Sequence, residues 1–350
     1  MTTGLRARRA AAASVTMDDV ARLAGVSRAT ASRVMNNSPR VRPEARVAVE
    51  AAVADLGYVP NRAARALMTR RSDSIGVIVM EPTGRLFEDP FFGQLLAGIS
   101  EGLADADLQL VLMVAQAPRE AARVERYLAA GHLDGAVLVG PHGNPPLVRR
   151  LHAHGVPMVM SGRAQGVAVS YVDSDNRGGA RLAVAHLAAR GRRRIATIHG
   201  SLDLSSGADR LAGYRDGLCD AGIEEDHRLV VDGDFDAVTA GTAMQALLAR
   251  CPDVDAVFAA SDSMAAAAVR VLLDAGRRIP EDVAVVGFDD TPLATSTRPA
   301  LSTVRQPISA MGREIIHLLL RRIANPADAP SQVVFATELV VRESSGGPGA

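Results

Sequence analysis

Lysine and tryptophan are absent from this chain of 350 residues, and cysteine occurs only twice. All 39 basic residues are therefore arginine. Cys219 and Cys251 lie far apart in the sequence and form no Cys-x-x-Cys pair. Because disulfide frameworks and redox motifs need several or closely spaced cysteines, we expect two reduced thiols in a reducing compartment.

Long apolar runs are also missing. No run reaches the ~18–20 apolar residues that a membrane-spanning helix needs, so we expect no membrane segment. The start, MTTGLRARRAAAAS, lacks the leucine-rich stretch that is typical of a signal peptide, and we expect residues 1–14 to be a disordered tail. These features favour a cytoplasmic protein.

The motifs of common catalytic sites are absent as well. The chain has no phosphate-binding loop of the GxxxxGK[ST] type, no GxSxG and no HExxH. His152 and His154 alternate on an expected helix, so their side chains point apart and do not form a metal site. We therefore expect no enzymatic activity, no metal and no cofactor.

Charge is distributed unevenly although the net charge is zero. Residues 1–72 contain thirteen arginines and five acidic residues, a balance of +8, so the rest of the chain carries −8. A compact basic end on an acidic body is typical of a nucleic-acid-binding module joined to another unit. A solvated charged tail is the alternative, but only Arg6, Arg8 and Arg9 lie in the tail.

Two short helical patterns meet at Gly25 within residues 16–37, TMDDVARLAGVSRATASRVMNN. Thr16 and Asp19 have the spacing of a capping box, and Gly25 provides the left-handed turn of a tight helix–helix corner. Ser27 is expected to cap the second helix, whose outward face carries small or cationic side chains: Arg28, Ala29, Ser32 and Arg33. This helix is predicted to enter a DNA major groove, because small residues permit close approach and arginine binds guanine edges and phosphates. An ordinary helical hairpin is the alternative.

Further helical and strand patterns complete the chain. A third helix is predicted from Pro43 to Gly57. Beyond it, apolar strand patterns cover 75–80, 108–115, 135–140, 156–161, 193–200 and 281–290, and helical patterns cover 92–104 and 173–191. Repeated apolar strands with helices between them predict parallel sheets covered on both faces, arranged as two similar lobes.

The run VTMDDVARLAGVSRATASRVMNN, followed by LGYVPNRAARAL, resembles the LacI (lac repressor) family of transcription regulators, and weaker motifs extend this resemblance over about residues 15–342. Ala31 departs from the family, which more often has valine there. The resemblance implies an all-α helix-turn-helix headpiece (15–59), a hinge (60–73) and a two-lobed, doubly wound α/β core (74–343) of the type I periplasmic-binding-protein fold, before a short tail (344–350). It further implies an N-lobe of about 74–190 and 307–325 and a C-lobe of about 191–306 and 326–343.

The same resemblance implies which residues bind DNA. In the major groove, Arg28, Ala29 and Arg33 would read bases or flanking phosphates, and the DNA backbone would be held by Thr16, Ser27, Thr30 and Asn36. In the hinge, Asn61, Ala64 and Leu67 would act in the minor groove, where an inserted apolar side chain unstacks a base step. A plain linker with one buried leucine is the alternative for this segment.

The effector is implied to bind at the carboxyl ends of the strands, where ligands gather in open parallel sheets. The matching positions are Phe92, Ser161, Asp175, Ser206, Arg210, Phe235, Ser261 and Asp289. Arg210 and Asp289 would bind hydroxyls through charge-assisted hydrogen bonds, and the two phenylalanines would provide apolar walls. The alternatives are a salt bridge between the lobes for the first pair and core packing for the second.

We therefore expect a transcriptional repressor that binds near-palindromic operator DNA as a homodimer under the control of a small-molecule effector. A sugar or sugar derivative is our first expectation for the effector, and a purine-type corepressor is the second. Two other classes are a solute-binding receptor and an enzyme fused to a helix-turn-helix. The basic N-terminal segment argues against the receptor, and the absent catalytic motifs argue against the enzyme.

Overall fold

The computed structural model describes residues 15–35, 38, 40–58, 71–143, 145–164 and 166–346. The chain divides into two compact units, residues 1–72 and residues 73–350. Within the described residues, no helix is long and apolar enough to cross a membrane. Cys219 and Cys251 are both free thiols, as expected.

The first unit is a bundle of three helices, α1 (Met17–Leu23), α2 (Arg28–Met35) and α3 (Pro43–Leu56). The predicted capping box is confirmed, since the Thr16 and Asp19 side chains each accept a hydrogen bond from the other residue's backbone N–H. Gly25 has the left-handed backbone that turns α1 into α2, with φ of +65°. The small core is formed by one face of each helix: Val20, Ala21, Ala31, Val34, Val49 and Ala52.

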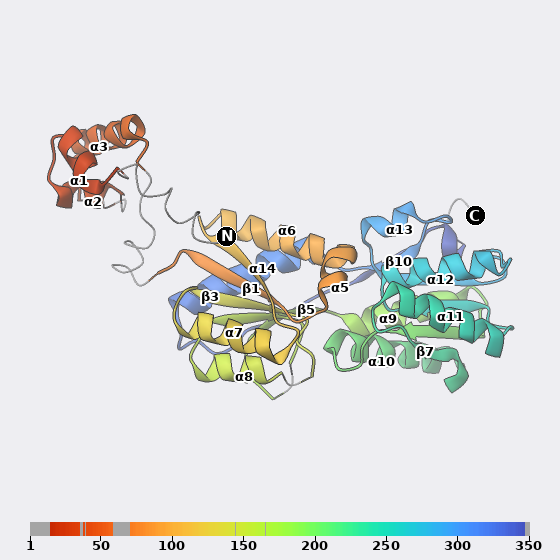
Figure 1. Cartoon of the computed structure of the whole chain (residues 1–350). Coiled ribbons are helices and arrows are strands. Elements are labelled where there is room, and N and C mark those ends of the chain that lie inside the picture. Colours follow the sequence, from red (N-terminus) through yellow and green to blue (C-terminus); the bar gives the residue numbers. More distant parts are fainter. Residues whose placement is uncertain are drawn as a thin grey trace, which may run out of the picture. The chain divides into compact units, whose positions relative to one another are not determined.

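The N-lobe of the second unit contains a six-stranded sheet in which every strand pair is parallel. Its strands in spatial order are β11 (Gln332–Phe335), β5 (Ser170–Ser174), β4 (Met158–Ser161), β3 (Gly135–Val139), β1 (Ser74–Val79) and β2 (Gln109–Val114). Helices α6 (Pro90–Ala104) and α14 (Ile308–Ala324) cover one face, and α7 (Pro118–Ala129) and α8 (Pro146–Ala153) cover the other (Figure 1). Gly98 permits the close contact of α6 with α14, because an added Cβ would lie 2.1 Å from the Ser309 carbonyl oxygen.

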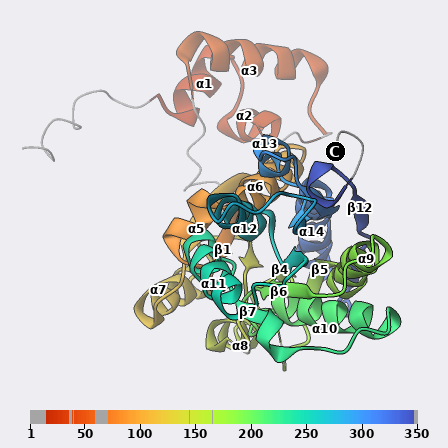
Figure 2. The ribbon, with the colours of Figure 1, turned by 90° about the vertical axis from the view of Figure 1, so that its right-hand side faces the viewer.

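The C-lobe repeats this plan with one antiparallel edge strand, β12. Its strands in spatial order are β12 (Glu338–Val340), β10 (Ser302–Arg305), β9 (Ala284–Asp289), β8 (Ala256–Ala259), β6 (Ile195–His199) and β7 (Val230–Asp232). Figure 2 shows α9 (Asn176–Ala189) and α10 (Ser205–Asp220) on one face, and α11 (Ala237–Arg250) and α12 (Asp262–Asp274) on the other. The predicted fold, a helical headpiece and a two-lobed doubly wound core, is confirmed.

Two of the expected lobe boundaries need correction. The chain crosses to the C-lobe directly after β5, not near residue 190, because α9 packs on α10 and on the C-lobe sheet. It crosses for the last time between β11 and β12, not near residue 325, because β11 pairs with β5 of the N-lobe. The helix predicted over 173–191 also begins later, at Asn176, since residues 170–174 form β5.

Short helices fill the remaining connections. These are α5 (Thr83–Glu88), which follows β1, α13 (Pro292–Ser296), which follows β9, and the 3₁₀ turns His227–Leu229 and Glu343–Ser345. Of these, α5 is the one that bears on the site, because it lies between β1 and α6 at the carboxyl end of the N-lobe sheet.

Candidate functional site

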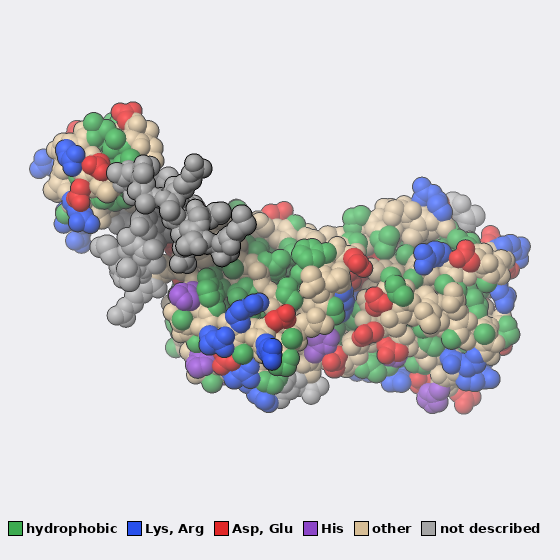
Figure 3. Space-filling view, viewed as in Figure 1, with side chains coloured by type: hydrophobic (Ala, Val, Ile, Leu, Met, Phe, Trp, Pro, Cys, Tyr) green, Lys and Arg blue, Asp and Glu red, His purple; other side chains and the backbone are tan. Residues whose placement is uncertain are grey.

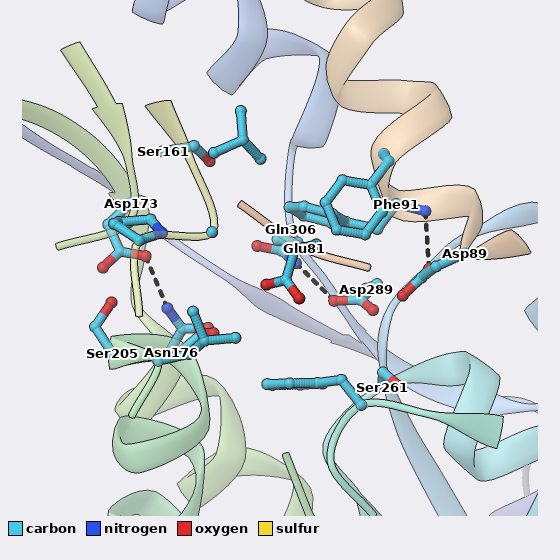
Figure 4. Close-up of a pocket in the computed structure, with 18 of the residues that line it drawn as sticks. Glu81, Asp89, Phe91, Ser161, Asp173, Asn176, Ser205, Ser261, Asp289 and Gln306 are labelled. Atoms are coloured by element: carbon cyan, nitrogen blue, oxygen red, sulfur yellow. Dashed lines mark hydrogen bonds between the residues drawn. The ribbon is translucent and has the colours of Figure 1, made fainter. Parts of the chain in front are cut away.

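A cavity of about 660 Å³, including its part open to solvent, lies between the two lobes at the carboxyl ends of both sheets (Figure 4). Seven of the eight predicted effector residues line it: Phe92, Ser161, Ser206, Arg210, Phe235, Ser261 and Asp289. Residues of both lobes contribute, so a ligand in this cavity would contact both at once.

Arg210 and Asp289 form the most deeply buried charged pair of the cavity. Arg210 Nη1 donates to Asp289 Oδ1 over 3.2 Å and to the Ala260 carbonyl oxygen over 2.6 Å, and its guanidinium lies 3.7 Å from the centre of the Phe288 ring. Gln306 Nε2 donates to the same Asp289 oxygen over 2.6 Å. Burial raises the pKa of Asp289, and the charge of Arg210 opposes that rise.

The alternative of a salt bridge between the lobes is wrong for this pair. Arg210 is on α10 and Asp289 ends β9, so both belong to the C-lobe. They contact each other inside one lobe while lining the cavity that separates it from the other.

The end of β5 contributes Asp173 to the N-lobe side of the cavity. Asp173 Oδ1 accepts a hydrogen bond of 2.8 Å from Asn176 Nδ2 (Figure 4). Asn176 Oδ1 in turn accepts one of 2.8 Å from Arg210 Nε. Asp173 Oδ2 is buried without a hydrogen-bond partner among the described residues. Burial raises the pKa of Asp173, and the positive charge of Arg163 partly offsets this rise. The site therefore holds a second buried carboxyl group beside an amide and a guanidinium.

Asp175 was predicted to bind effector, and the structure does not place it in the cavity. It is the N-cap of α9, and its Oδ1 accepts a hydrogen bond of 2.9 Å from the Gly178 backbone N–H. The cavity is lined instead by Asp173 and Asn176 on either side of it in the sequence. The reason is the unpredicted strand β5, which turns into α9 at this residue.

Three phenylalanines line the cavity, Phe91 and Phe92 from the N-lobe and Phe235 from the C-lobe. Phe92 is 3% exposed and packs in the N-lobe core, and Phe235 is 4% exposed and packs in the C-lobe core. The core-packing alternative is therefore correct for most of each ring, although both rings also line the cavity. Arg85 of α5 joins them, with its guanidinium carbon 5.6 Å from the Phe92 ring centre and 4.7 Å from that of Phe235.

Polar side chains of the strand ends complete the lining. Ser261 caps α12, with its Oγ accepting from the Met264 N–H over 3.2 Å. Asp89 caps α6 by accepting from the Phe91 N–H over 3.0 Å, and burial raises the pKa of its carboxyl group. Within the described residues, no group of three His, Cys, Asp or Glu side chains could hold a metal ion.

In the first unit, α2 has the two faces that the sequence predicted. Ala31 and Val34 are buried, whereas Arg28, Ala29 and Arg33 are exposed. Ser27 caps the helix by accepting from the Thr30 N–H over 3.1 Å, and the two hydroxyl groups lie 2.9 Å apart. Asn36, Asn61, Ala64 and Leu67 lie outside the described residues.

Models of two protein families match this chain. The family described as "Bacterial regulatory proteins, lacI family" matches residues 16–61, and that described as "Periplasmic binding protein-like domain" matches residues 184–345. The transcriptional regulator CelR of Thermobifida fusca is 48% identical over 332 residues, which cover 94% of this chain and 98% of that protein. The chain belongs to the LacI family.

Other members are similar over a comparable length. GalR of Escherichia coli K12 is 34% identical over 339 residues, covering 95% of this chain and 96% of GalR. A solved structure titled as a CelR–cellobiose complex is 46% identical with a TM-score of 0.76, covering 94% of this chain and 99% of that one. The lac repressor dimer bound to operator and the anti-inducer ONPF is 28% identical with a TM-score of 0.84, covering 95% of this chain and 99% of that one.

Membership of the family decides between the classes considered above. This LacI-family protein is a DNA-binding transcriptional regulator whose partner is operator DNA, and it is not an enzyme. The solute-binding receptor is excluded, because the matched relatives carry the same helix-turn-helix before the same core.

Several lining residues of this LacI-family cavity were not predicted: Glu81, Arg85, Asp89, Phe91, Asp173, Asn176, Ser205, Gln306 and Met311. Glu81 directly follows the first predicted strand, so the strand-end rule that identified Asp289 would also have found it. Gln306 lies on a crossing between the lobes, and no sequence pattern marks it as a site residue.

Proposed function

We propose that this regulator binds cellobiose, or a closely related disaccharide of glucose, in the cavity between its lobes, and that this ligand controls its affinity for operator DNA. The observation that carries the proposal is the similarity along the whole chain to CelR, one structure of which is a complex with cellobiose.

The chemistry of the cavity supports a hydroxylated ring as ligand. Arg210, Asp289 and Asp173 offer charged donors and acceptors, which make the stronger hydrogen bonds to hydroxyl groups. Asn176 and Gln306 add amides that can donate and accept. The rings of Phe91 and Phe235 offer flat apolar surfaces to the C–H face of a sugar.

The exposed face of α2 supports a role in reading the major groove. We propose that Arg28, Ala29 and Arg33 contact base edges or the adjacent phosphates. Ser27, Thr30 and Thr16 already use their hydroxyl groups at helix starts, so their contact with the DNA backbone would come through helix N-termini as well as side chains. The acting form would be a homodimer bound to operator DNA, like the lac repressor in its solved dimer structure. It would act on the chromosome in the cytoplasm, with the hinge residue Leu67 in the minor groove.

Coupling between ligand and DNA requires that the ligand bind two lobe arrangements unequally. The cavity can bind a ligand differently in two lobe arrangements, because its walls come from both lobes. If the lobes move apart, the ligand loses its contacts with one wall. Ser174 Oγ of the N-lobe donates a hydrogen bond of 2.7 Å to Oε1 of Gln306, which lies on a crossing between the lobes and lines the cavity, so this bond links the N-lobe to the cavity wall.

The test is a titration of operator binding by the purified full chain. A binding-site selection first gives the operator, and fluorescence anisotropy then follows operator binding during addition of cellobiose, maltose, galactose, ribose or guanine. We expect cellobiose to change operator affinity by about 5- to 150-fold, the range of ordinary allosteric coupling, with little effect of the other compounds. A response to guanine alone, or to galactose or ribose alone, would replace the proposed ligand.

A further inference from the structure

Arg85 borders three hollows of the core at once. It lines the effector cavity, a shallower depression beside α11 and α12, and a larger hollow of about 1800 Å³, partly open to solvent, that we name the outer cleft. The outer cleft lies between the carboxyl ends of β1, β2 and β3 and the loops that follow β6 and β7. Because Arg85 and Glu81 are the residues shared by the cavity and the outer cleft, they form the wall between the two.

Contacts to both lobes hold Arg85 in this wall. Its Nη1 donates to Glu81 Oε2 over 2.7 Å within the N-lobe. Its guanidinium lies over Phe235 of the C-lobe, 4.7 Å from the ring centre. The side chain is only 16% exposed although it stands between two hollows. An arginine fixed by a carboxylate at one edge and an aromatic ring on its face fills the space that a longer ligand would need.

A histidine extends the wall to the C-lobe. Glu81 is 2% exposed, and its second oxygen, Oε1, lies 3.1 Å from His142 Nε2. His142 Nδ1 lies 2.9 Å from Oδ1 of Asp203, which follows β6 in the C-lobe. The four residues Glu81, Arg85, His142 and Asp203, here named the partition, therefore close the gap between the lobes with ion pairs. One Glu81 oxygen contacts Arg85 and the other contacts His142, so Glu81 connects these two residues within the partition.

The outer cleft offers the surface that further sugar units would need. Besides Glu81, four carboxylates line it, Glu88, Asp203, Asp234 and Asp236, and each can accept hydrogen bonds from hydroxyl groups. Apolar surface comes from the N-lobe, through Pro82, Ala115, Pro118, Pro145, Pro146 and Leu147. Figure 3 shows acidic side chains gathered along the boundary between the two lobes.

We propose that Arg85 determines the length of the sugar to which this regulator responds. The partition closes the cavity around a disaccharide, and loss of the Arg85 side chain joins the cavity to the outer cleft, so that glucose chains of three or four units are admitted. This proposal rests on the proposed function, because it takes the effector to be a short glucose chain.

The first experiment compares the change in operator affinity caused by cellobiose, cellotriose and cellotetraose for the wild type, Arg85→Ala and the control Arg119→Ala, which removes an exposed arginine of α7. We expect the potency of cellotriose relative to cellobiose to rise roughly tenfold or more in Arg85→Ala and to stay constant in Arg119→Ala. Because the two potencies are compared within one variant, a loss of affinity that is common to both sugars cancels in the ratio. An unchanged ratio in Arg85→Ala would overturn the proposal, whereas a wild type that responds to none of the three would overturn the proposed function instead.

The second experiment needs no ligand. Since the chain has no tryptophan and only four tyrosines, Phe235→Trp introduces a single tryptophan beside Arg85, which can be excited at wavelengths that tyrosine does not absorb. Acrylamide quenching is then measured for Phe235→Trp alone, with Arg85→Ala and with Arg119→Ala. We expect the quenching constant to rise severalfold only with Arg85→Ala, because the partition is then open. Equal quenching in all three proteins would show that Arg85 does not close the cavity, whatever the effector is.

Discussion

Arg210 and Asp289 lie 3.2 Å apart inside the C-lobe, and neither side chain crosses to the other lobe. Both face the cavity and both are about 95% buried. A pair in this position can bind a ligand without being needed to hold the lobes together. A variant of Asp289 that keeps the shape of the side chain can therefore test ligand binding.

The first prediction concerns this pair. Asp289→Asn keeps the shape of the side chain but removes a charged contact worth ~1.5–3 kcal/mol to a buried ligand, so apparent ligand affinity should fall by roughly 10- to 100-fold. Operator binding without ligand should stay near normal. Arg210→Ala should also lower the melting temperature, since it leaves the buried Asp289 without its counter-ion. A full ligand response in Asp289→Asn, measured by operator anisotropy, would remove this residue from the effector site.

A second prediction concerns base reading by α2. Arg33 is exposed at the end of the helix opposite to its cap. Arg33→Ala should weaken operator binding by ~1–3 kcal/mol through loss of a base or phosphate contact, with a smaller effect on random DNA. Exchange of Arg28 and Ala29 should instead change the preferred half-site in a binding-site selection. Equal losses on operator and random DNA would show that Arg33 contacts only phosphates.

The hinge gives a third prediction. Leu67 lies outside the described residues, and its role follows from the family resemblance. Leu67→Ala should reduce DNA bending and operator affinity, because an apolar side chain that unstacks a base step is lost. Ligand binding by the core should be unaffected. A wild-type bending angle in a gel-permutation assay would favour the plain-linker alternative.

The sequence was sufficient to predict most of the architecture for a physical reason. Strands such as 74–79 are buried along almost their whole length, so they appear as continuous apolar runs. The amphipathic α3, with proline at its first position and glycine after its end, carries its own start and stop signals. These are local signals, and the structure follows them.

Long-range placement was less accessible. The strand β5 reads SYVDS, in which polar residues interrupt the apolar run, and its last two residues fall within the helical pattern predicted over 173–191. The family resemblance implied Asp175 as an effector residue, whereas the cavity is lined by Asp173 and Asn176 on either side of it. The partner of β11 and the packing of α9 depend on contacts between distant segments, and periodicity within either segment does not encode them.

His142 gives a fourth prediction, on stability against pH. Glu81 and Asp203 raise the pKa of His142 from 6.5 to about 9, outweighing its partial burial. The histidine therefore contributes stability that is fully present below pH 6.5 and is lost as pH rises through about 9. We expect that contribution to be about 1 kcal/mol after solvent screening, seen as a fall in melting temperature between pH 7 and 9.5.

A matched pair of variants isolates this effect. His142→Gln should flatten the fall in melting temperature over that range, whereas His227→Gln, which removes an exposed histidine, should keep it. A second group titrates below this range: burial raises the pKa of Asp262 to about 7, so its ionisation lowers the stability of the fold as pH rises from about 4 to 7, mainly below the range of pH 7 to 9.5. If the melting temperature falls equally with pH in the wild type, His142→Gln and His227→Gln, the ion pairs of His142 are excluded as the cause of the fall.

The central claim is that a sugar in the cavity and operator DNA on the headpiece act on one another. Thermodynamic linkage makes this claim testable in both directions, since the factor by which the ligand changes operator affinity must equal the factor by which operator changes ligand affinity. The direct measurement is calorimetric titration of cellobiose into the full-length regulator, free and saturated with operator. We predict dissociation constants that differ by about 5- to 150-fold, equal to the factor measured on operator binding. Equal cellobiose affinity in the two states would contradict the account.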